Sequence, residues 1–305
     1  MLIALRARLN GWRRGLRWQL GRPLSHWSGQ WCRAQLGQLP PPPWPEKPLL
    51  PLPVITLCGR AHLPMLQVSL RTMLHAWPQL PALRVVSDGS ATVDELKAAL
   101  QWWQNPLEVH AWEEFAPSGN ARSTLAGCWA ARHPLGRKLA VLQAIDCHPS
   151  LWMDTDLLWF GGLPAEAGGG RNEAALIVAT DQFCAYAPEL FAIARAELSP
   201  QPYMNSGLIL LRRPLGELVD IERLLASAYP DSAPHLWTEQ TLIALAARRH
   251  GRVWSREEIA INVWDVHQLR PTFKGKRWSA RHYTTPARDL FWRDAWWLLA
   301  RGVQP

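Results

Sequence analysis

Hydrophobic positions along the chain alternate between two spacings, beginning near residue 54. Short apolar runs of strand length recur at 54–58, 83–86, 107–112, 151–153, 174–179 and 207–211. Between them apolar residues return every three or four positions, the spacing of one helix face, over 62–77, 92–103, 136–147, 216–228, 238–249 and 288–300. Thr92 and Glu95 have the spacing of a capping box, which marks a helix start. This alternation predicts an α/β fold whose largely parallel sheet is covered by helices on both faces. In such sheets ligands bind at the carboxyl ends of the strands.

The N-terminal segment has a different pattern. Over residues 1–39, Leu, Ile and Trp return at helical spacing among arginines. The chain has a formal charge of +8, but residues 1–45 hold seven arginines and no acid, while the other 260 residues carry 26 basic and 25 acidic groups. Because the excess charge belongs to the N-terminus, a nucleic-acid-binding domain with a basic face is disfavoured.

An Arg-rich face opposite Leu and Trp is typical of a helix that lies on an anionic membrane surface. Two alternatives stay open for residues 1–39: packing on the main domain, or removal as a targeting segment. A proline-rich stretch follows and predicts a stiff spacer. We therefore expect an N-terminal segment over 1–53 and one domain over 54–305.

Composition also bears on the compartment. The sequence has no uncharged apolar run of about 18 residues and no secretory hydrophobic region. The five cysteines are scattered without a CxxC pair, which favours a reducing compartment over a disulfide framework. We expect a cytoplasmic protein, peripheral on the membrane. The glycine-rich loop at 161–170 is predicted to be a mobile cover.

The chemistry centres on Asp154-Thr155-Asp156, which directly follows the apolar run at 151–153. Side chains alternate along an extended segment, so both carboxylates face one side. The nearest basic residues are Lys138 and Arg171, and two buried acids are costly without a cation. Oxygen ligands suit magnesium or manganese. The plain alternative is a pair of solvated acids in a turn.

The stretch 137–158 resembles the central block of the GT-A-fold, nucleotide-sugar-dependent glycosyltransferases, and is most similar to the retaining family 8 group and its relatives. Three further motifs follow in that family's order: Asn205-Ser206-Gly207 at a strand, Thr238-Glu239-Gln240-Thr241 at a helix start, and Arg281-His282-Tyr283 near the C-terminus. The resemblance covers about residues 54–285. The family usually has Asp at the position of Glu239, and Gly and Lys where this chain has Thr284, Thr285 and Pro286.

The resemblance implies a GT-A fold and a metal-dependent transfer of a sugar, with retention, from a nucleotide diphosphate sugar to a saccharide or lipid-linked acceptor. A UDP-sugar is the implied donor. Mn²⁺ or Mg²⁺ would be held by Asp154, Asp156 and His282. Catalytic roles fall to Asn205, Glu239 and Gln240. Donor contacts fall to Lys138, Arg137, Asp88, Thr56 and Asp154.

Two other functions remain open on the sequence. A haloacid-dehalogenase-type phosphatase also uses a DxD motif, but its nucleophile usually follows the first strand of the domain, whereas about 100 residues of the domain precede Asp154. A non-catalytic, membrane-associated scaffold of the same fold is the third reading. The 19 tryptophans should be mostly core, although Trp237, Trp254, Trp264 and Trp278 are candidates for lining an acceptor groove.

Overall fold

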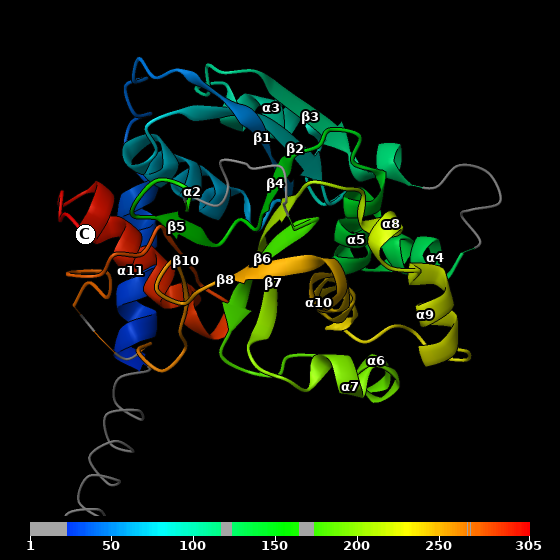
Figure 1. Ribbon diagram of the computed structural model, residues 1–305. Coiled ribbons are helices and arrows are strands. Elements are labelled where there is room, and N and C mark those ends of the chain that lie inside the picture. Colours follow the sequence, from blue (N-terminus) through cyan, green and yellow to red (C-terminus); the bar gives the residue numbers. More distant parts are fainter. Residues whose placement is uncertain (1–22, 117–123, 165–173, 267, 269) are drawn as a thin grey trace, which may run out of the picture.

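The computed structural model describes residues 23–116, 124–164, 174–266, 268 and 270–305 (Figure 1). A seven-stranded sheet has the order β3-β2-β1-β4-β7-β6-β8. Its strands are β1 (Leu49–Cys58), β2 (Leu80–Ser87), β3 (Leu107–Ala111), β4 (Ser150–Met153), β6 (Leu176–Asp181), β7 (Tyr203–Leu211) and β8 (Gly251–Trp254). β7 is antiparallel to both of its neighbours, and the other neighbouring pairs are parallel. The predicted mixed, mainly parallel sheet is confirmed.

A small second sheet lies beyond the carboxyl end of β4. It has the order β5-β10-β9 and consists of β5 (Leu157–Trp159), β9 (Ile259–Ile261) and β10 (Ala280–His282). β10 is antiparallel to β5 and parallel to β9. Because β5 begins just after Asp156, this sheet connects the end of β4 to the C-terminal part of the chain.

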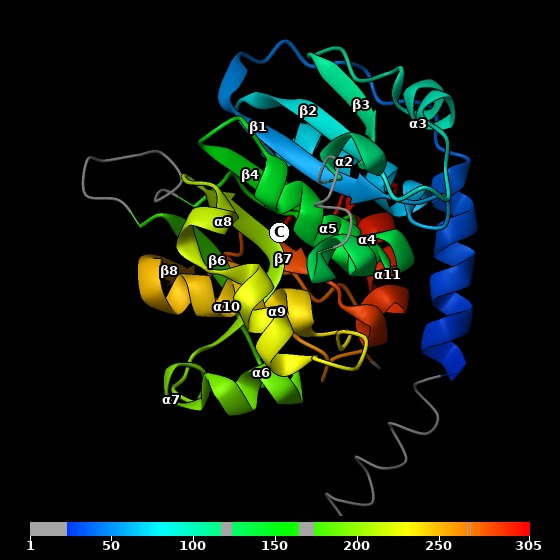
Figure 2. The same ribbon diagram turned by 90° about the vertical axis from the view of Figure 1, so that its right-hand side faces the viewer.

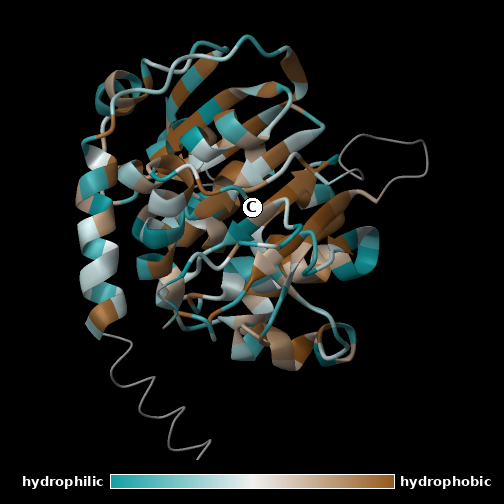
Figure 3. Cartoon of the chain, turned by 90° about the vertical axis from the view of Figure 1, so that its left-hand side faces the viewer, coloured by the Kyte–Doolittle hydropathy of each residue, from teal (hydrophilic) through white to brown (hydrophobic). Residues whose placement is uncertain are grey.

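Helices cover both faces of the large sheet because its strands have apolar residues on both sides. Trp152 of β4 packs with one set of helices, whereas its neighbours Leu151 and Met153 pack with the other. The first set is α4 (Leu125–Arg132), α5 (Pro134–Ala144), α9 (Ile221–Ala228) and α10 (Thr238–His250); the second is α2 (Leu63–Ala76) and α3 (Val93–Leu100). In Figure 3 the hydrophobic residues gather on the strands of this sheet.

The described chain also has η1 (Trp112–Phe115), α6 (Pro188–Ile193), α7 (Arg195–Leu198), α8 (Leu215–Leu218), η4 (Thr285–Ala287) and α11 (Arg288–Leu299). The sequence predicts one helix over 216–228, but the structure has two. The first ends at Leu218, and Asp220 caps the second, where its side chain accepts a hydrogen bond from the backbone N–H of Arg223.

The predicted first strand is longer than expected. β1 begins at Leu49 and includes Pro51 and Pro53, where prolines had favoured a spacer. Its pairing with β2 shifts register between Leu50 and Val54. The register shift accommodates residues that lack a backbone N–H, so the strand extends through them.

A helix that includes residues 23–37 lies beside the domain (Figure 2). Its buried positions, Ser25, Gly29, Cys32 and Leu36, are spaced three or four residues apart. Cys32 and Leu36 pack in one apolar cluster with residues of α2 and α11. The alternative of packing on the main domain is therefore confirmed for this part of the N-terminal segment. The other predictions for residues 1–22, and residues 165–170 of the predicted glycine-rich loop, lie outside the described residues.

The opposite face of the 23–37 helix is apolar as well. The exposed side chains include Leu24, Trp27 and Trp31, and Trp27 is 70% exposed. Among the described residues, no helix combines the length and the apolar content that a bilayer crossing needs. The division of the chain at residues 53 and 54 stays a proposal.

Candidate metal and active site

Strand pairing brings the two acids and the histidine together. Asp154 and Asp156 lie in the turn that joins β4 to β5, and His282 ends β10. In the register of the small sheet His282 is opposite Leu157, the residue after Asp156. The backbone N–H of Tyr283 donates to the carbonyl oxygen of Asp156 at 2.9 Å. The site is thus fixed by main-chain hydrogen bonds and not by side chains alone.

Asp154, Asp156 and His282 each offer one ligand atom, and these atoms lie within 4.8 Å of one another. His282 Nε2 is 2.9 Å from Asp156 Oδ1 and 3.9 Å from Asp154 Oδ2. Two carboxylates and one imidazole are a donor set that suits Mn²⁺ or Mg²⁺. The predicted ligands therefore converge on one point, and the alternative of two solvated acids in a turn does not describe Asp156, which is buried.

Asn205 fixes the orientation of the imidazole. The backbone N–H of Gly207 donates to Asn205 Oδ1 at 2.8 Å, so that atom is an acceptor. His282 Nδ1 lies 2.8 Å from the same oxygen and must therefore donate its proton there. Nε2 then faces the carboxylate of Asp156, and an imidazole nitrogen in that position needs either a proton or a cation.

Charge in this cluster shifts both pKa values. Burial lowers the pKa of His282, but the carboxylate of Asp156 outweighs burial and raises it above its usual range. Burial raises the pKa of Asp156, but His282 and Arg288 together hold it below its usual range. In the absence of a cation the two groups form an ion pair.

Glycine is required at position 207 of the Asn205-Ser206-Gly207 motif. A Cβ built there would lie 2.2 Å from Cε1 of His282, far inside van der Waals contact. The imidazole ring therefore rests directly against the backbone of β7. This close approach, and not a turn, explains the glycine.

Lys138 lies behind the metal ligands and is 3% exposed. Its ammonium contacts Asp154 Oδ1 at 3.0 Å, Glu239 Oε1 at 2.9 Å and the carbonyl oxygen of Ser206 at 2.8 Å. These three contacts use its three protons. To contact a donor, as predicted, Lys138 would have to leave these three partners. In the structure it instead positions the carboxylates of Asp154 and Glu239.

Glu239 lies at the start of α10, and it is buried next to Ser206, whose hydroxyl donates to Glu239 Oε2 at 3.1 Å. Burial raises its pKa in spite of the neighbouring Lys138. Burial lowers the pKa of Lys138, but the charges of Asp154 and Glu239 raise it overall. The predicted residues Lys138, Asp154 and Glu239 therefore form one buried charged cluster.

Asp181 is a residue of this site that the sequence analysis did not single out. It ends β6 and is 5% exposed. Asn205 Nδ2 donates to its Oδ2 at 2.9 Å, and Gln240 Nε2 lies 3.5 Å from the same atom. Its position at the carboxyl end of an apolar run was the available signal, but the strand was expected to end two residues earlier.

Arg288 is the second residue that the sequence analysis missed. It begins α11, and its Nη2 is 3.6 Å from Asp156 Oδ2, with the side chain 39% exposed. Lys138 is enclosed, whereas Arg288 reaches the metal ligands from the solvent side and could still move toward a ligand. The available signal was a basic residue at the predicted start of the last helix.

The remaining predicted donor contacts lie elsewhere. Asp88 follows β2, and Arg137 donates to its carbonyl oxygen and stacks over the ring of Trp112 at 4.9 Å. Asp88 is two strands from β4 in the sheet, which corresponds to about 10 Å. Thr56 is fully buried within β1, and its hydroxyl has no hydrogen-bond partner among the described residues. The structure thus brings Asp88 and Arg137 together at the same sheet edge as the metal ligands, but not into contact with them.

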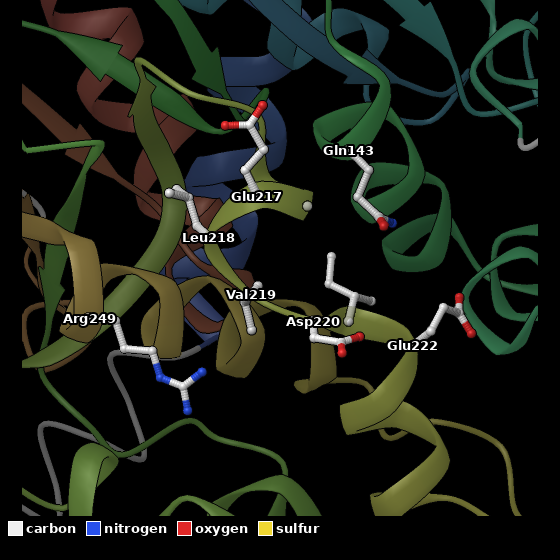
Figure 4. Close-up of a pocket in the computed structure, with 9 residues that line it drawn as sticks. Gln143, Glu217, Leu218, Val219, Asp220, Glu222 and Arg249 are labelled. Atoms are coloured by element: carbon white, nitrogen blue, oxygen red, sulfur yellow. The ribbon is translucent and has the colours of Figure 1, made fainter.

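A cavity of about 490 Å³ is lined by residues that include Gln143, Glu217, Asp220, Glu222 and Arg249 (Figure 4). It lies at the far end of α10, since Arg249 is ten residues from Glu239, or about 15 Å along the helix. Glu222 accepts hydrogen bonds from two backbone N–H groups at the start of α4, and Asp220 caps α9. Both acids thus stabilise helix ends. Because the cavity lies at the other end of α10, it is separate from the candidate site.

Comparison with solved structures identifies the fold. Mouse xyloside xylosyltransferase 1 in its apo form has a TM-score of 0.54 at 12% identity, with 77% of this chain and 98% of that chain covered. The galactosyltransferase LgtC, solved with donor and acceptor sugar analogs, has a TM-score of 0.52 at 14% identity, with 80% and 95% covered. The bifunctional glycosyltransferase WbbM has a TM-score of 0.55 at 11% identity, with 86% and 53% covered.

No protein-family model matches the sequence, and no curated protein matches it either. At identities between 11% and 14% the likeness establishes the fold alone. The chain has the GT-A fold of these glycosyltransferases, as the resemblance predicted.

Proposed function

We propose that this protein is a metal-dependent glycosyltransferase that moves a sugar from a nucleotide diphosphate sugar, with UDP as the nucleotide, to a saccharide or lipid-linked acceptor. The convergence of Asp154, Asp156 and His282 at the carboxyl end of β4 carries this proposal. A GT-A fold provides the sheet edge at which a nucleotide would lie.

The chemistry follows from charge. Bound Mn²⁺ or Mg²⁺ would act as a Lewis acid on the departing diphosphate. Arg288 adds positive charge on the solvent side of Asp156, where negative charge would grow as the leaving group departs. Asn205 keeps Nε2 of His282 directed at the metal position through its hydrogen bond to Nδ1.

Roles for the other residues are part of the same proposal. Glu239 and Gln240, together with Asn205, would stabilise the donor sugar at its reacting carbon. Of the predicted donor contacts we retain Asp88 and Arg137 in this proposal, because the side chains of Lys138 and Thr56 are enclosed. The width of the sheet edge between Asp88 and Asp154 corresponds to about 10 Å, enough for part of an extended nucleotide diphosphate. We propose transfer with retention of the anomeric configuration.

The phosphatase reading is not favoured, because the fold is that of glycosyltransferases and the two acids follow the fourth strand of the chain. The hypothesis of a non-catalytic scaffold predicts that no nucleotide sugar binds. The experiment described next therefore tests this hypothesis as well.

The experiment replaces one metal ligand. In Asp156→Ala, release of UDP from UDP-galactose, UDP-glucose and UDP-xylose with Mn²⁺ should fall at least about 100-fold relative to the native chain. The matched control is Asp231→Ala, since Asp231 is an exposed acid in a loop. Full activity of Asp156→Ala would overturn the metal-dependent mechanism, and the absence of donor binding to the native chain would support the scaffold.

We also propose that residues 1–39 attach the protein to an anionic membrane surface, with the protein in the cytoplasm. Leu24 and Trp27 support this proposal, because they are exposed on the described part of the segment while the opposite face is packed on the domain; Trp31 is also exposed, although one edge contacts Trp296 of α11. Basic residues of the same segment would add attraction to anionic lipids.

A further inference from the structure

Two exposed aromatic side chains form a pair next to the candidate site. Trp264 is 61% exposed and Phe183 is 43% exposed, and their ring centroids lie 5.6 Å apart in an edge-to-face arrangement. We call these two rings the aromatic pair. Single exposed apolar side chains are common on protein surfaces, whereas exposed apolar side chains that adjoin one another indicate a binding surface.

Phe183 is held by the same carboxylate that contacts the proposed sugar-binding residues. Asp181 Oδ1 accepts hydrogen bonds from the backbone N–H groups of Gln182 and Phe183, at 2.6 and 3.2 Å. Its other oxygen accepts from Asn205 at 2.9 Å. Phe183 therefore shares the carboxylate of Asp181 with the side chains of Asn205 and Gln240.

Trp264 is held from the other side by the strand that carries His282. Arg281, the preceding residue, donates to the carbonyl oxygen of Asn262 at 2.8 Å and makes two hydrogen bonds to Asp265 at 2.7 and 2.9 Å. Asn262 and Asp265, which lie on either side of Trp264 in the chain, are thus both anchored to a buried guanidinium. Trp264 is therefore exposed in a turn that hydrogen bonds hold in place.

A hydrogen bond between two side-chain amides joins the segment of Phe183 to the segment of Trp264. Gln182 Nε2 donates to Asn262 Oδ1 at 3.2 Å, and the same oxygen accepts from the backbone N–H of Trp264 at 3.0 Å. The backbone N–H of Val263 lies 3.4 Å from Gln182 Oε1. The aromatic pair therefore has side-chain amides at its base, which can bind hydroxyl groups.

We infer that the aromatic pair is the platform on which the acceptor saccharide stacks. One face of a pyranose ring is made of C–H groups that carry partial positive charge, and the faces of Trp and Phe rings carry partial negative charge. Side-chain amides beside the rings match sugar hydroxyls, which a lipid chain would not use. Among the other tryptophans considered for this role, Trp254 is fully buried and belongs to the core.

This inference rests on the proposed function and names the acceptor end of the same site. The probes are methyl β-D-galactopyranoside, methyl β-D-glucopyranoside and lactose, with binding followed by ligand-observed NMR in the presence of UDP and Mg²⁺. Trp264→Ala should bind the preferred saccharide at least about tenfold more weakly than the native chain, and Trp264→Phe should recover part of the loss. Binding of UDP and Mg²⁺, measured by calorimetry, should not change.

The control is Trp27→Ala, which removes an indole that is even more exposed and lies far from the metal ligands in sequence, on the 23–37 helix. Equal saccharide binding by Trp264→Ala and the native chain would overturn the inference, as would no binding of any of the three saccharides to a native chain that binds UDP and Mg²⁺. Failure of the native chain to bind UDP with Mg²⁺ would instead overturn the proposed function. Unchanged thermal unfolding of Trp264→Ala excludes misfolding as the cause of its loss.

Discussion

His282 can occupy its position only because residue 207 is glycine and has no side chain. The imidazole rests against the backbone of β7, where a methyl group would lie 2.2 Å from Cε1. Its two nitrogens are then committed to Asn205 and Asp156. The geometry of the metal ligands therefore depends on a residue that cannot itself bind a metal.

We predict that Gly207→Ala weakens Mn²⁺ binding by about 10–100-fold, because the ring must leave the hydrogen bond that orients it. Titration of Mn²⁺ followed by electron paramagnetic resonance measures this affinity. Gly216→Ala is the matched control, since a Cβ at Gly216 meets no atom within 4 Å. Native Mn²⁺ affinity in a folded Gly207→Ala protein would contradict the proposed ligand geometry.

Sequence motifs predicted the residues of this site unevenly. Asp154 and Asp156 were singled out by their position after an apolar strand, whereas His282, Asn205, Glu239 and Gln240 were singled out by the resemblance to the glycosyltransferase family. Asp181 and Arg288 were missed because their nearness to the site depends on which strands and helices pack together, and no local pattern encodes that. Trp152 likewise donates to Asp154 at 2.8 Å, although its sequence context is that of a core strand.

Between elements, the 23–37 helix approaches α11 closely at Gly29. A Cβ there would lie 2.9 Å from backbone atoms of Asp289 in α11, whereas a Cβ at Gly37 meets nothing within 4 Å. Ser25 adds a hydrogen bond to the carbonyl oxygen of Val266 at 2.7 Å. The helix is therefore packed directly on α11, at the end of the chain that also supplies Arg288.

We predict that Gly29→Ala lowers the free energy of unfolding by about 1–3 kcal/mol, because the helix must move away from α11. Gly37→Ala should be neutral or stabilising by up to roughly 1 kcal/mol, since Ala favours a helix more than Gly does. Urea unfolding of the two variants measures both values. Equal stability of the two would show that the close approach at Gly29 is relieved without cost.

Helix positions were predicted well where the apolar spacing was long and regular, as in α2 and α10, whereas β7 begins four residues before the predicted run at 207–211. The strands of the small sheet were not predicted, because β5, β9 and β10 are only three residues long and carry no measurable period. His282 ends one of these short strands. The sequence therefore predicted the ligand but not the element that positions it.

At the scale of the molecule, the excess positive charge lies in the N-terminal segment, far in sequence from the candidate site. The N-terminal 45 residues carry seven arginines and no acid, and the described part of them exposes Leu24, Trp27 and Trp31. The remaining residues are nearly neutral in sum. A protein built in this way would meet an anionic membrane through one segment and leave the sheet edge free.

We predict that the full chain co-sediments with phosphatidylglycerol-containing vesicles more than with phosphatidylcholine vesicles, and that salt weakens the binding. Leu24→Ser combined with Trp27→Ser should reduce the affinity on the order of tenfold or more, because two exposed apolar side chains no longer enter the interface. Trp264→Ser removes an indole of similar exposure from the aromatic pair and should bind vesicles as the native chain does. Equal loss in both variants would mean that exposed apolar area, and not the N-terminal segment, drives the binding. Absence of vesicle binding by the native chain would remove the membrane proposal and leave the 23–37 helix as a structural support for α11.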